Sequence, residues 1–185
     1  MSKYLAAILI VPAAVALSGS FDSQPTAPQA AAEREMPREQ ALRVTFDLAR
    51  GRRWELHWDG VLAYDMASGE LVRHVRLPGA TFSAARESCL PGILLGRSGD
   101  LMVSSNAQPR LWRVSPARFE VEVYDLALAI DDDKDFGFGK LAWSPGARTL
   151  DAVSSPMGAT WRIDLSTATA IKLGASAPGG VATCL

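Results

Sequence analysis

An aromatic residue inside a short apolar segment recurs along this chain at intervals of just under fifty residues. The three segments are Tyr64-Asp65-Met66, Trp112-Arg113-Val114 and Trp161-Arg162-Ile163, and their spacings are 48 and 49 residues. A second pair, Val103-Ser104-Ser105 and Val153-Ser154-Ser155, repeats at fifty residues just before the two Trp-Arg pairs. A repeat of this period predicts consecutive units that each fold in the same way and pack on their neighbours.

The units have the pattern of antiparallel strands. Apolar and polar residues alternate in Phe119–Val123 and in Thr160–Leu165, and Leu62, Tyr64 and Met66 share one face of another run. Alternation with period two is typical of half-buried strands. Turn residues separate the runs, at Asp59-Gly60, Ser68-Gly69, Ser98-Gly99-Asp100, Pro145-Gly146 and Pro156-Met157-Gly158. The sequence therefore predicts an all-β meander.

The run Leu141–Ala168, LAWSPGARTLDAVSSPMGATWRIDLSTA, resembles a blade of the WD-repeat and related bacterial β-propellers. Val61–Val72 resembles the last hairpin of such a blade, as in quinoprotein-like and surface-repeat propellers. Ile93–Val123 is the weakest match, and Pro109 is expected at an edge or in a turn because it cannot donate to a ladder. The resemblance covers residues 43–173 and implies consecutive antiparallel propeller-like blades; a small β-sandwich or an open meander is the alternative. It carries over no catalytic residue.

Three blades are too few for an ordinary ring, since propellers typically close with about 4–8. The end blades are expected to expose apolar faces, and the run Phe136–Trp143 (FGFGKLAW) adds apolar surface. The sequence leaves three outcomes open. The chain self-associates, it docks on a larger protein partner, or it is a truncated relic of a longer protein.

The N-terminus has the pattern of an export signal. Lys3 precedes a run of thirteen uncharged residues, Leu5–Leu17, and small residues follow at 18–20. That run is shorter than the roughly 20 residues of a membrane-spanning helix. We expect a signal peptide at 1–20, a disordered tether at 21–42 and the β-propeller-like repeat domain at 43–185, in a periplasmic or secreted protein with no stable membrane span after cleavage. An uncleaved anchor is the alternative.

The charge of the chain argues against nucleic acid as a partner. The sequence has 19 Lys and Arg against 20 Asp and Glu, and loss of Lys3 with the leader makes the balance one unit more negative. Binding to phosphates depends on a strong excess of basic side chains. The short basic run at 50–53 is interpreted as a solvated hairpin tip or as a contact for an acidic partner.

Two cysteines, Cys89 and Cys184, lie 95 residues apart. An oxidising compartment would allow a disulfide between them. The chain-entropy model assigns such a loop about 4–5 kcal/mol of stabilisation. Two separate thiols are the alternative.

Metal ligands are few. Asp131, Asp133 and Asp135 are the candidate metal ligands, because they occupy the first, third and fifth places of a calcium loop. The sixth place is Phe136 and the twelfth is Ala142, so a solvated acidic loop is the alternative. The two histidines, His57 and His74, have no third ligand at matching spacing.

No arrangement of residues in the sequence indicates catalysis. There is no G-x-S-x-G elbow and no Walker loop, and the five tryptophans are expected mostly in the core. The sequence favours an exported, non-enzymatic protein-interaction or binding module without a cofactor. An accessory subunit or remnant of a periplasmic propeller enzyme, quinoprotein dehydrogenase-like or lactonase-like, is the alternative.

Overall fold

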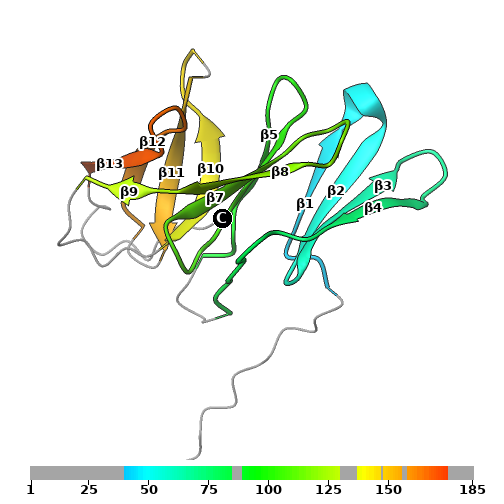
Figure 1. Cartoon of the computed structure of the whole chain (residues 1–185), viewed down its shortest axis with the longest axis horizontal. Helices are drawn as coiled ribbons and strands as arrows, with labels where there is room; N and C mark the ends of the chain where they lie inside the picture. The colour runs from blue at the N-terminus through cyan, green and yellow to red at the C-terminus, as the bar shows by residue number, and fades with distance from the viewer. Residues whose placement is uncertain (1–39, 85–88, 130–136, 147, 156–157, 175–185) are drawn as a thin grey trace, which may run out of the picture. The chain divides into compact units, whose positions relative to one another are not determined.

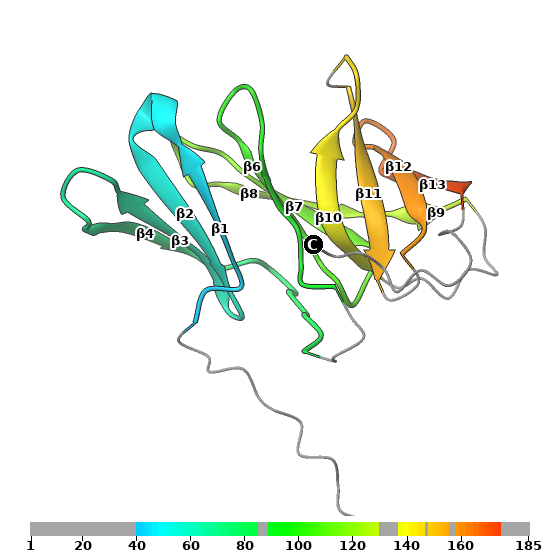
Figure 2. The same ribbon diagram turned by 180° about the vertical axis from the view of Figure 1, so that it is seen from behind.

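The computed structural model describes residues 40–84, 89–129, 137–146, 148–155 and 158–174. These residues form three antiparallel sheets in chain order, called here the first, middle and third sheets (Figures 1 and 2). The first sheet consists of β1 (Arg43–Asp47), β2 (Arg52–His57), β3 (Gly60–Asp65) and β4 (Leu71–Val75). The middle sheet consists of β5 (Ile93–Leu95), β6 (Leu101–Ser104), β7 (Arg110–Val114) and β8 (Val121–Asp125). The third consists of β10 (Gly137–Trp143), β11 (Thr149–Ser155), β12 (Thr160–Asp164) and β13 (Thr169–Gly174).

Each sheet contains a four-stranded antiparallel meander, and the third sheet gains a fifth strand that links it to the middle sheet. β9 (Ala127–Leu128) follows β8 directly but pairs in parallel with β13, at the outer edge of the third sheet (Figure 1). A 3-10 turn, η1 (Leu48–Arg50), joins β1 to β2. The fold is therefore all-β, built of consecutive propeller-like blades as the sequence predicts.

The turn after the third strand of each sheet repeats in detail. It contains one residue in the left-handed region, at Gly69 (φ 74°), Phe119 (φ 58°) and Ala168 (φ 50°). It begins at Asp65, Ser115 and Asp164, whose side chains accept bonds from backbone N–H groups of the turn. Such side chains stabilise tight turns by satisfying these donors. The turns thus repeat at 50 and 49 residues.

The exact repeat corrects one prediction made from the sequence. Trp112 and Trp161 lie three residues before their turns, whereas Tyr64 lies only one residue before its turn. The residue equivalent to the two tryptophans is therefore Leu62. The spacing of 48 residues therefore matched Tyr64 to Trp112 wrongly. Tyr64, Trp112 and Trp161 do all lie in the third strands of their sheets.

Neighbouring sheets pack face to face. We call the face that points to the preceding sheet the front face and the opposite one the back face. In the first sheet, which has no preceding sheet, the front face is the one that points away from the middle sheet. The front faces of the middle and third sheets carry equivalent, fully buried residues: Leu101, Val103, Trp112 and Val114 in the middle sheet, and Leu150, Ala152, Trp161 and Ile163 in the third. The middle set packs against the back face of the first sheet, formed by Trp54, Leu56, Val61 and Ala63. The third set packs against Met102 and Leu111 of the middle sheet.

Close packing also requires glycine at the two-residue hairpin between β2 and β3. Gly60 has a φ of 152°, and a Cβ at this position would overlap with the carbonyl oxygen of Val75. The residue at this position must therefore be glycine for β4 to pair with β3.

Two further expectations are corrected here. Phe138 and Leu141, in the apolar run thought to need an external cover, are 1% and 8% exposed because the chain's own core covers them. Leu42, assigned to the end of the tether, is 7% exposed, and its N–H donates to the carbonyl of Leu56.

Pro109 lies in the turn between β6 and β7, as expected. Within the described ranges, no helix has the length and hydropathy needed to cross a membrane.

We predict that Leu101→Ala lowers the free energy of unfolding by about 2–5 kcal/mol, because it opens a cavity between the first and middle sheets. Leu48→Ala is the matched control, since Leu48 is 77% exposed and its loss should cost less than about 0.5 kcal/mol. Urea denaturation of both variants measures the difference. Equal stabilities would contradict packing of the two sheets through Leu101.

Candidate functional site

The outward face at each end of the stack is polar at its centre. On the front face of the first sheet, Arg53 and Glu55 occupy two positions that are apolar and buried in the other sheets. The equivalent residues are Leu101 and Val103 in the middle sheet and Leu150 and Ala152 in the third. The Arg53 Nε lies 2.9 Å from the Glu55 carboxylate, and its guanidinium lies 4.7 Å from the Tyr64 ring. This charged centre is flanked by exposed apolar side chains: Val44, Phe46 and Leu71, which are 45%, 52% and 52% exposed.

The back face of the third sheet has an ion pair of its own. Asp151 and Arg162 are cross-strand partners, and the Arg162 Nε lies 2.9 Å from Asp151 Oδ1. Their equivalents in the first sheet are Trp54 and Ala63, and in the middle sheet Met102 and Arg113. The expectation that both end faces are apolar is therefore wrong at their centres, where ion pairs replace apolar residues.

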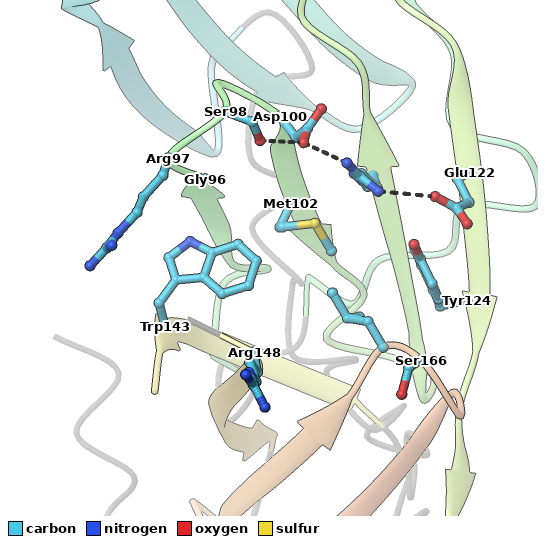
Figure 3. Close-up of a pocket in the computed structure, with 12 residues that line it drawn as sticks. Gly96, Arg97, Ser98, Asp100, Met102, Glu122, Tyr124, Trp143, Arg148 and Ser166 are labelled. Atoms are coloured by element: carbon cyan, nitrogen blue, oxygen red, sulfur yellow. Dashed lines mark hydrogen bonds and ion pairs between the residues drawn. The ribbon is translucent and has the colours of Figure 1, made fainter. Parts of the chain in front are cut away.

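A cavity of about 740 Å³ opens between the middle and third sheets (Figure 3). It lies at the end of the sheets that carries the β5–β6, β10–β11 and β12–β13 turns. The β5–β6 turn, β6, β7 and β8 supply one side, and β10, the β10–β11 turn and the β12–β13 turn supply the other. The lining residues are Gly96, Arg97, Ser98, Asp100, Met102, Arg113, Glu122, Tyr124, Trp143, Arg148, Leu165 and Ser166.

A network of charges fixes one wall of the cavity. Arg113 donates from Nη2 to Asp100 Oδ2 at 2.7 Å, and its Nη1 lies 3.6 Å from the Glu122 carboxylate. Burial favours a higher pKa for Asp100, but bonds from the Ser98 hydroxyl and Arg113 together lower that pKa below its ordinary value. The bond to Asp100 in turn raises the pKa of Arg113. The pKa of Tyr124 is raised, mainly because the side chain is partly buried and secondly because its hydroxyl bonds to Glu122.

The opposite wall is aromatic and cationic. Trp143 is half-buried, and its indole Nε1 donates to the carbonyl of Leu95 at 3.2 Å, which fixes the ring. Arg148 lines this side from the β10–β11 turn, while Arg97 lines the cavity from the β5–β6 turn of the middle sheet, and both side chains are exposed (Figure 3). Among the described residues, neither guanidinium takes part in a salt bridge. No sequence motif indicated this cavity, because its residues come from seven separate segments.

The described structure does not test the calcium candidates and separates the two histidines. Asp131, Asp133 and Asp135 lie outside the described residues. His57 lies 3.2 Å from Glu55, and His74 lies 3.4 Å from Asp59. In the described part of the chain, no group of three or more His, Cys, Asp or Glu side chains has the arrangement of a metal site.

The basic run at 50–53 serves contacts within the chain. Arg50 pairs with Asp47 at 3.1 Å and donates to the carbonyl of Ser98 at 2.6 Å. Arg52 lies over the Phe119 ring at 4.8 Å and donates to the carbonyl of Pro116. The hairpin tip of the first sheet is therefore tied to two turns of the middle sheet.

Comparisons with known proteins support the fold. No family model matches the sequence, and no curated protein matches it. Solved structures do match in three dimensions. A streptogramin B lyase aligns with a TM-score of 0.54 at 14% identity over 75% of this chain and 41% of its own. The virginiamycin B lyase of Staphylococcus aureus gives 0.56 at 15% identity over 80% and 44%. The Kuenenia stuttgartiensis hydrazine synthase gives 0.50 at 13% identity over 79% and 38%.

These neighbours are β-propeller-like proteins, so the described sheets form part of a propeller-like fold. This chain spans about two fifths of the length of each neighbour. Identities of this size establish the fold alone.

We predict that Asp100→Asn lowers the free energy of unfolding by roughly 1–2 kcal/mol at pH 7, because the bonds of Arg113 and Ser98 to a carboxylate are lost. The folded-state pKa of Asp100 is depressed, so its contribution is present above the unfolded value of 3.8 and is lost as the pH falls through the folded value. Urea denaturation of both proteins at pH 7 and pH 3 checks this. A stability difference that does not shrink at pH 3 would contradict it.

The disulfide between Cys89 and Cys184 stays a prediction, because Cys184 lies outside the described residues. Cys89 is 2% exposed, and its N–H donates to Ser155 Oγ in the core between the sheets. We expect the intact mass of exported protein to rise by two hydrogens on reduction. Cys184→Ser should remove this change, and an unchanged mass in the wild type would refute the bridge.

Proposed function

We propose that this protein is an exported, non-enzymatic interaction module whose partner is a second copy of itself. The front face of the first sheet of one copy binds the back face of the third sheet of the other. Two such contacts give a dimer of six sheets, which falls within the usual 4–8 blades of a closed propeller.

The charge arrangement of the two end faces carries this proposal. In the middle sheet, the residues equivalent to Arg53 and Glu55 pack against the back face of the preceding sheet. If a second copy occupies that place, the back-face residues Asp151 and Arg162 meet Arg53 and Glu55. Each face then offers one cation and one anion to the other, so the ion pairs exchange partners across the interface.

The surrounding residues suit an interface. Phe46 and Leu71 provide exposed apolar surface on one face, and Ile171, 54% exposed, provides it on the other. Arginine and aromatic residues such as Arg53 and Tyr64 are enriched in the centres of protein interfaces. The export signal expected at 1–20 supports a periplasmic or secreted location for this assembly.

Light scattering with size-exclusion chromatography tests the proposal on the mature chain. We expect twice the monomer mass for the wild type. Arg53→Glu alone and Asp151→Arg alone should each be monomeric, with at least tenfold weaker association, because each brings like charges together at the interface. Arg76→Glu is the control with the same charge change, at an exposed residue outside both faces, and should stay dimeric.

Mixing the two single variants gives the sharpest result. A heterodimer contains one reversed pair, Glu against Arg, and one native pair, so the mixture should recover the dimer mass although neither variant does alone. A monomeric wild type, or a mixture that stays monomeric, would refute the proposal. Capture of a different protein in its place would favour an accessory subunit of a larger propeller enzyme.

A further inference from the structure

We propose that the cavity between the middle and third sheets binds a small aromatic carboxylate. The cavity lies within a single chain, so this inference is independent of the association of two copies. Its volume of about 740 Å³ falls in the range of small-molecule sites.

The shape of the cavity fits a flat apolar body. Trp143 presents the face of an indole ring whose nitrogen is already bonded to Leu95, so the ring can stack without losing a polar contact (Figure 3). The buried Met102 and the half-buried Leu165 add apolar surface beside it. An aromatic ring gains stacking and dispersion contacts in such a slot.

The charges of the cavity select an anion. Asp100 and Glu122 both face Arg113, which leaves the charges of Arg97 and Arg148 uncompensated by any described residue. Arg97 lines the cavity from the β5–β6 turn of the middle sheet, and Arg148 lines it from the β10–β11 turn, which follows Trp143. A planar carboxylate accepts parallel hydrogen bonds from a guanidinium, so a ring stacked on Trp143 would direct its carboxylate to one of these two arginines.

The far wall limits the alternatives. The Glu122 carboxylate would repel a second negative charge placed on that side, so a monoanion fits better than a dianion that spans the cavity. A cationic aromatic would lie beside the two free guanidinium groups and is disfavoured.

Calorimetric titration of the mature protein with 2-naphthoate tests the inference. We expect a Kd of about 1 mM or tighter, given the efficiency typical of ligands of this size. Acetate, which lacks the ring, and 2-naphthylmethylamine, which has the opposite charge, should each bind at least tenfold more weakly.

Variants assign the binding to this cavity. The double change Arg97→Ala with Arg148→Ala should weaken 2-naphthoate binding at least tenfold, whereas Arg76→Ala, an exposed arginine away from the cavity, should leave it unchanged. Trp143→Leu should abolish it, and circular dichroism verifies that this variant folds. Absence of 2-naphthoate binding in the wild type, equal affinity for the amine, or full affinity in the double variant would overturn the inference.

Discussion

The structure depends on covering both faces of the middle sheet. A twisted antiparallel sheet is stable in water only when its apolar faces are buried. Leu101, Val103, Trp112 and Val114 are buried against the first sheet, while Met102 and Leu111 are buried against the third. The middle sheet therefore organises the fold, and each outer sheet has one buried and one open face.

Polarity at equivalent positions follows this arrangement along the chain. On the back faces, the central cross-strand pair changes from Trp54–Ala63 to Met102–Arg113 and then to Asp151–Arg162. The first pair is buried, the second borders the cavity, and the third faces outward. The same structural position thus supplies core, cavity wall and proposed interface, depending on what lies opposite. Repeat proteins in general carry polar residues on the outer faces of their terminal units.

The sequence predicted the strands well because strand formation is a local property. Alternation around Trp161 and turn residues such as Asp65 and Asp164 report directly on strands and hairpins. The hairpin of Val61–Val72 and the turn position of Pro109 were predicted correctly for this reason. The repeat of Trp112 and Trp161 was correct, but Tyr64 was aligned with the wrong residue because an aromatic is a less reliable marker than the turn that follows it. The match of Val103 with Val153 is also wrong by one residue, since Val103 lies opposite Trp112 and Ala152 lies opposite Trp161.

The sites were harder to predict, for a physical reason. Alternation shows which residues share a face, but it does not show whether another sheet covers that face. Arg53 and Glu55 are ordinary outward strand residues in the sequence, and only their equivalence to Leu101 and Val103 marks them as unusual. The cavity brings together turns from two sheets, and that proximity depends on packing between sheets.

Amide hydrogen exchange of the mature protein tests the central claim, that the first and third sheets enclose the middle one. The account predicts that β6 and β7 exchange most slowly of all strands, with protection that approaches the free energy of global unfolding, while β4 and β13 exchange faster. If the amides of β6 and β7 exchange as fast as those of β4, or faster, the middle sheet is not covered on both faces and the account is contradicted.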